Sequence, residues 1–104
     1  MKYLVQATAG PVFDTPGETA QLLEKLVLPS FDMLIRWEKA NILTGGLPVG
    51  DRALVFVVEA DTNQSLDAML RSIPMWGMLQ WEVTPLISFA ERATIEREIL
   101  KKIV

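Results

Sequence analysis

The sequence predicts an α+β domain built on one four-stranded antiparallel sheet, and three observations along its 104 residues support this class. Segments with the two-residue period of strands and segments with the 3.6-residue period of helices follow one another in the order β-α-β-β-α-β. A glycine-rich connection joins the two middle strands, as in a hairpin. Helix start signals precede the helical segments. Together these features describe the ferredoxin-like arrangement, with both helices on one face of the sheet.

The first strand and the long first helix are expected at residues 2–9 and 15–40. The helix begins with a capping box at residues 15–18, in which a threonine caps the helix and a proline occupies its first turn. Pro29 lies near the middle of the helix. Because proline removes a backbone hydrogen bond and clashes with the preceding turn, we expect a kink or a break near Leu28. Such a kink would open space beside Ser30 and Met33.

The remaining strands and the second helix follow in order. Residues 42–45 form a short second strand, and residues 52–60 form the strongest strand, whose apolar character predicts a central strand covered on both sides. Residues 61–63 offer several caps for an amphipathic helix, whose apolar positions are Leu66, Met69, Leu70 and Ile73. Residues 79–84 alternate as a last strand. Pro85 is expected to end this strand because it has no N–H to donate.

A terminal helix is predicted at residues 88–104, starting with a capping box from Ser88 to Glu91. Half of the chain is hydrophobic, which predicts that some surface is buried against other copies. The apolar stripe of the terminal helix needs a surface to pack on, and another subunit is the natural partner. The open sheet face is expected to pair with a second sheet. We therefore predict one domain, residues 1–104, in a dimeric α+β barrel.

Composition excludes several classes of function. The chain has no cysteine and no histidine, which excludes disulfides, thiolate nucleophiles, Ser-His catalysis and the usual zinc and haem sites. No spaced acidic loop suggests a Mg²⁺ or Ca²⁺ site, so no metal is expected. The formal net charge of −3 gives no electrostatic basis for nucleic-acid binding. No apolar run approaches the ~20 residues that span a bilayer, and the strand-like start argues against a signal peptide, so a cytoplasmic location is expected.

Two segments resemble a known family. They are Leu70-Arg71-Ser72-Ile73-Pro74-Met75-Trp76 and Gln80-Trp81-Glu82-Val83-Thr84-Pro85-Leu86. They are similar to the proline-aromatic turn and the acidic final strand of the muconolactone isomerase-like proteins. Residues 58–61, before the second helix, also resemble these proteins. The similarity in element order covers most of the chain, and its distinctive part is residues 54–86.

The resemblance implies a dimeric α+β barrel, often built into larger rings in which the C-terminal helix packs across subunits. It also implies a cofactor-independent isomerase that moves a double bond within a small lactone during aromatic-compound degradation. The expected partners are thus a small apolar carbonyl compound or lactone and further copies of the chain. The characterised isomerases carry His, Trp and Arg around the second strand, where residues 41–48 here are Asn-Ile-Leu-Thr-Gly-Gly-Leu-Pro.

Proton abstraction next to a carbonyl needs a base and a donor for the developing enolate oxygen. Glu82 is the first candidate base; its structural alternative is an interface or barrel-lining carboxylate paired with an arginine. Arg52 is a candidate to bind a carboxylate or enolate, or else forms a surface ion pair with Asp51 or Glu59. Tyr3 is a candidate donor that points its hydroxyl into the pocket, or else a packed edge residue.

Five further residues are candidates to bind the substrate, and two of them have a structural alternative. Trp37 is either a core residue or a pocket wall, and Trp76 lines either a pocket mouth or a subunit contact. Asp32 and Glu38 are assigned to the solvated side of the first helix. The complete set of substrate-binding candidates is Met33, Trp37, Phe56, Trp76 and Trp81.

Three functions remain open on the sequence alone. The first is the isomerase described above. The second, a close neighbour, is a cofactor-free oxygenase or cyclase acting on polyaromatic ketones. The third is a non-catalytic small-ligand-binding or assembly module on the same barrel, which the absence of histidine and the apolar hairpin at residues 47–49 favour.

Overall fold

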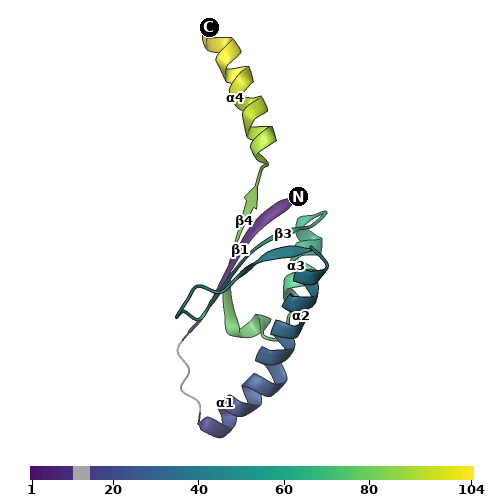
Figure 1. Cartoon of the computed structure of the whole chain (residues 1–104), viewed down its shortest axis with the longest axis vertical. Coiled ribbons are helices and arrows are strands. Elements are labelled where there is room, and N and C mark those ends of the chain that lie inside the picture. The colour runs from purple at the N-terminus through teal and green to yellow at the C-terminus, as the bar shows by residue number, and fades with distance from the viewer. Residues whose placement is uncertain (11–14) are drawn as a thin grey trace.

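The computed structural model describes residues 1–10 and 15–104, and it has the predicted α+β fold (Figure 1). Four antiparallel strands form one sheet in the order β2-β3-β1-β4. The elements in chain order are β1 Lys2–Ala9, α1 Pro16–Leu22, the π-helical turn η1 Leu23–Val27, α2 Leu28–Lys39, β2 Leu43–Gly46, β3 Ala53–Glu59, α3 Asn63–Arg71, the 3₁₀ turn η2 Trp76–Met78, β4 Leu79–Leu86 and α4 Phe89–Ile103.

The core lies between the sheet and the helices α2 and α3, which cover one of its faces (Figure 1). The alternation predicted for residues 2–9 is confirmed, because every second side chain of β1 is buried. The inward-facing residues of the two central strands are Tyr3, Val5, Ala7, Leu54, Phe56 and Val58. β3 is a central strand of the sheet, as predicted, and within the chain the helices cover one of its faces. Val55 and Val57 of β3 point to the other face, which no helix of the described residues covers, and are half-buried. Cover on that second face stays a prediction, because it requires another subunit.

The long first helix has an irregular turn where the sequence predicts one, but it does not break. The π-helical turn η1 separates α1 from α2, and the N–H of Leu28 bonds to the carbonyl of Leu23, five residues back. Pro29 follows directly, in the first turn of α2. A π turn is wider than an α turn, so it makes room for the proline ring without ending the helix.

Ser30 fills the space that a kink was expected to open beside it. Its side chain is fully buried. The Ser30 hydroxyl donates to the carbonyl oxygen of Leu26 at 2.6 Å and accepts the N–H of Met75 at 2.9 Å. Met33, the second residue expected beside open space, is half-buried and packs against the core. The hydroxyl therefore ties the middle of the long helix to the turn that leads into β4.

The C-terminal part departs from the prediction at one point. Pro85 lies within β4, opposite Tyr3, rather than ending the strand. β4 is an edge strand, where a proline can turn its nitrogen away from the neighbouring strand. The predicted capping box at Ser88 and Glu91 is confirmed, with both of its hydrogen bonds present. Helix α4 then projects away from the body of the chain (Figure 1).

We predict that Ser30→Ala lowers the free energy of unfolding by about 1–3 kcal/mol, because the Met75 N–H is then buried without an acceptor. Urea unfolding at one fixed protein concentration measures the change. Thr94→Ala is the matched control, since its hydroxyl also bonds to a carbonyl four residues back but is exposed. Equal effects of the two substitutions would contradict the role given to Ser30.

Candidate functional site

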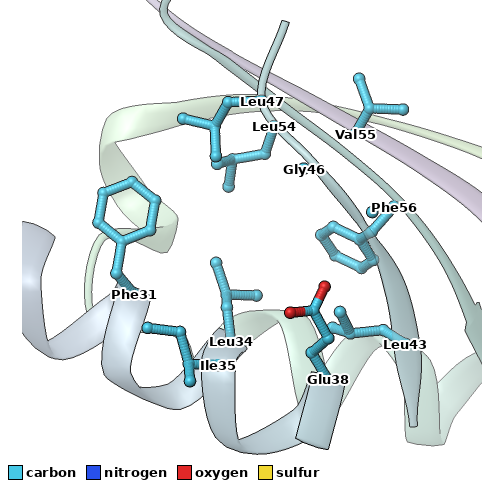
Figure 2. Close-up of a pocket in the computed structure, with 11 residues that line it drawn as sticks. Phe31, Leu34, Ile35, Glu38, Leu43, Gly46, Leu47, Leu54, Val55 and Phe56 are labelled. Carbon is cyan, nitrogen blue, oxygen red and sulfur yellow. The ribbon is translucent and has the colours of Figure 1, made fainter. Parts of the chain in front are cut away.

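Two adjoining apolar cavities lie between the long helix and the β2–β3 hairpin. The smaller has a volume of about 160 Å³ and lies between α2 and the two strands (Figure 2). The larger, of about 370 Å³, lies nearer α1 and the turn before β4. Three residues line both cavities: Phe31, Leu47 and Leu54. The larger cavity falls within the size range of small-molecule sites, which is roughly 300–1,000 Å³.

The smaller cavity follows from the spacing of residues on α2. Phe31, Leu34, Ile35 and Glu38 recur at the interval that places side chains on one face of a helix, and Figure 2 shows them along one wall. The opposite wall comes from β2 and β3. There, Gly45 and Gly46 of β2 line the cavity, and Gly45 lies so close to Val55 and Phe56 of β3 that a Cβ would overlap them.

Glu38 is the ionisable residue in the lining of the smaller cavity. Figure 2 shows its carboxylate turned toward the cavity, near Leu43 and Phe56. The assignment of Glu38 to the solvated side of the helix is therefore wrong in part: the residue is exposed, but it stands at the cavity wall. Within residues 1–10 and 15–104, no cationic group lies within ion-pair distance of it.

The larger cavity has three polar residues in its lining: Thr19, Asp51 and Arg52. The carboxylate of Asp51 accepts the backbone N–H of Arg52 at 2.7 Å, so it fixes the loop that leads into β3. The expected ion pair of Arg52 with Asp51 or Glu59 is absent from the part of the chain that the structure describes. Glu59 instead lies 3.9 Å from the amino group of Met1.

The three predicted catalytic residues are not brought together within one chain. Tyr3 pairs with Val58 near the end of β3, whereas Arg52 precedes the first residue of that strand. At about 3.3 Å per residue, this separation is roughly 20 Å. The buried Tyr3 hydroxyl donates to Oδ1 of Asn63 at 2.5 Å, at a separate cavity of about 290 Å³ beside α3.

Glu82 lies on the opposite face of the sheet from both cavities. It is exposed and stands opposite Gln6, which in turn stands opposite Val55. The arginine partner considered for Glu82 is not found among the described residues. Glu82 therefore belongs to the open sheet face, whose side chains form a mixed apolar and polar surface around Leu4, Gln6, Val55, Val57 and Thr84.

Of the five predicted substrate-binding residues, Phe56 alone lines either cavity, and it lines the smaller one. Met33 and Trp37 pack against the core from α2. Trp76 and Trp81 join each other, since the indole N–H of Trp81 donates to the carbonyl of Trp76 at 3.0 Å. The Arg71 guanidinium lies 4.5 Å from the centre of the Trp76 ring, and Trp76 is in the lining of neither cavity.

Several lining residues were missed, although the sequence held a signal for part of them. Phe31, Leu34, Ile35 and Glu38 have i, i+3, i+4, i+7 spacing, which marks a shared helix face. The contribution of η1, through Leu23 and Val27, depends on a π turn that apolar periodicity does not predict.

Two further findings concern membranes and metals. Among the described residues, no helix is long and apolar enough to cross a bilayer. In the same part of the chain, no three acidic side chains are grouped so that they could hold a metal ion.

Comparison with known proteins identifies the fold. No protein-family model and no curated protein sequence matches the chain. Among solved structures, it is similar to the crystal structure of a muconolactone isomerase, with a TM-score of 0.67 and 20% sequence identity. The match covers 85% of this chain and 90% of the isomerase chain. At this identity, the likeness shows the shared α+β fold.

We predict that Gly45→Ala destabilises the protein by about 1–3 kcal/mol, because its methyl group would overlap the carbonyl oxygen of Val55 and the backbone of Phe56. Gly46→Ala is the matched control. A Cβ there meets no atom within 4 Å, so the expected change is within about 1 kcal/mol. Thermal and urea unfolding of both variants measure the difference, and two equal values would contradict the close approach of β2 to β3.

Proposed function

We propose that this protein binds a small, largely apolar carbonyl compound in the cavities beneath the long helix and shifts a double bond in it without a cofactor. The proposal draws on the fold shared with muconolactone isomerase. The single observation that carries it is the carboxylate of Glu38 facing an otherwise apolar cavity (Figure 2). An apolar enclosure with few polar groups is the usual form of a small-molecule site.

Glu38 is the proposed general base. The carboxylate removes a proton from the carbon next to the carbonyl, and the resulting carboxylic acid returns the proton at another carbon, so the double bond moves and no proton is lost. A base that gives the proton back needs no further residue for its regeneration. Glu82 is the second candidate. It would act only if two open sheet faces meet and enclose it, as in the proposed barrel.

Paired substitutions separate the two candidates. Glu38→Gln is expected to slow isomerisation by about 10²–10⁴-fold, the usual contribution of a general base, while Glu82→Gln keeps turnover within a few-fold of the wild type. Muconolactone in D₂O is the first substrate, followed by ultraviolet absorbance and by deuterium incorporation in proton NMR. If a folded Glu82→Gln variant loses turnover and Glu38→Gln does not, Glu38 is not the base and the reaction takes place on the open sheet face.

The same proposal includes a homo-oligomer. Its support is the open sheet face and α4, which stands clear of the body and carries exposed apolar side chains (Figure 1). These are Phe89, Ile95, Ile99, Leu100 and Ile103. We propose that residues 88–104 pack on another subunit and that two open sheet faces pair as a barrel. In a single chain, both the terminal helix and the open sheet face leave apolar surface exposed to water.

Ile99→Glu is expected to convert the oligomer into a smaller species, because a carboxylate would then enter an apolar contact without a partner. Thr94→Glu adds the same charge to the other side of α4 and should leave the mass unchanged. Size-exclusion chromatography with light scattering reports both masses at one concentration. A wild-type monomer, or an Ile99→Glu protein of wild-type mass, would contradict the role of α4.

A second candidate function, non-catalytic ligand binding, is favoured by one observation. In the described lining of the smaller cavity, Glu38 has no polar side chain beside it that would stabilise an enolate oxygen. On this alternative the compound binds but does not exchange protons with D₂O, and Glu38→Gln alters affinity at most.

A further inference from the structure

The two cavities adjoin along the long helix. They share Phe31, Leu47 and Leu54, so these side chains stand between the two spaces. On the helix side, the lining runs from Leu22 to Glu38, which at about 1.5 Å per residue corresponds to roughly 24 Å. A single lactone ring would occupy a small part of this length. The space therefore fits an extended apolar molecule.

The walls of the larger cavity are also adaptable. Met75 and Met78 line it from the turn before β4, and methionine side chains adjust to ligands of irregular shape. The π turn η1 contributes Leu23 and Val27 to the same wall, and turns of this kind occur often at functional sites. These features favour an apolar body over a polar one.

Asp51 and Arg52 both line the larger cavity, but their charged groups make different contacts. Asp51 uses a carboxylate oxygen to accept the Arg52 backbone N–H, so part of its hydrogen-bonding capacity serves the loop. The Arg52 guanidinium has no carboxylate within ion-pair distance among the residues described, and it lines the cavity from an exposed position. Guanidinium groups pair well with planar carboxylates through two parallel hydrogen bonds.

We infer that the two cavities join into one trough that holds a single elongated apolar carboxylic acid, with its carboxylate on Arg52 and its apolar body extending past Phe31 toward Glu38. The inference rests on the binding part of the proposed function and names its ligand class. It is independent of whether Glu38 transfers a proton. It also gives the ligand a direction, since Arg52 lines the larger cavity and Glu38 lines the smaller one.

Calorimetric titration of the full-length protein with decanoate, decanol and butanoate tests the inference. Decanoate should bind most tightly, because decanol lacks the anionic group and butanoate lacks the length. Arg52→Gln should weaken decanoate binding by about tenfold, the equivalent of one charged hydrogen bond, and leave decanol binding unchanged. Arg36→Gln, an exposed arginine of α2 outside both cavity linings, is the control and should change neither.

Three results would overturn the inference: no decanoate binding, equal binding of decanoate and decanol, or equal effects of Arg52→Gln and Arg36→Gln. The failure of this inference is distinguishable from the failure of the proposed reaction. If the protein isomerises a lactone but does not bind decanoate, the proposed reaction stands and the elongated ligand is ruled out. If decanoate binds in a way that depends on Arg52 but no carbonyl compound is turned over, the proposed ligand class stands and the isomerase activity is ruled out.

Discussion

The buried hydroxyl of Ser30 joins the long helix to the turn before β4, and the position of both cavities depends on that connection. Pro29 prevents a regular α-helical hydrogen bond at this point, and the π turn η1 accommodates it. Ser30 then bonds across to the Met75 backbone. Helix α2 is thereby held beside the sheet, with Phe31 and its neighbours facing β2 and β3. Without this connection, helix and sheet would be free to close the space between them.

The two faces of the sheet have separate roles in this account. The covered face carries the core and the cavities, whose charged lining residues are Glu38, Asp51 and Arg52. The open face carries Gln6 on the central strand β1 and Glu82 on the edge strand β4, and it is the surface that we propose for assembly. Likeness of fold to muconolactone isomerase does not assign a residue to a reaction at 20% identity. Function must therefore be argued from the side chains that line the cavities.

Much of the fold was predictable because local patterns agreed with the global arrangement. The alternation at Tyr3, Val5 and Ala7 identified the covered face, and the Ser88 capping box identified the start of α4. Pro85 was placed wrongly because the rule that proline ends a strand does not apply at a sheet edge. That exception depends on the order of the strands in the sheet. The order is set by pairing between segments that are far apart in the sequence.

The candidate site was less predictable for a related reason. Trp76 and Trp81 were expected in a pocket because large aromatic side chains are common there, yet each finds its partner locally. Glu82 and Tyr3 alternate on strands, but their strands turn them to different faces. Glu38 was set aside as a solvated residue. Only the packing of α2 against the Gly45–Gly46 segment makes its position a cavity wall.

The most direct test of the central claim, that the ligand binds between the long helix and the sheet, is methyl NMR of methionine-labelled protein titrated with decanoate. The account predicts shifts at Met75 and Met78, which line the larger cavity, and none at Met1, whose amino group is bonded to the Ala60 carbonyl in another part of the molecule. Shifts at Met1 with Met75 and Met78 unchanged, or no shift at saturating decanoate, would contradict it.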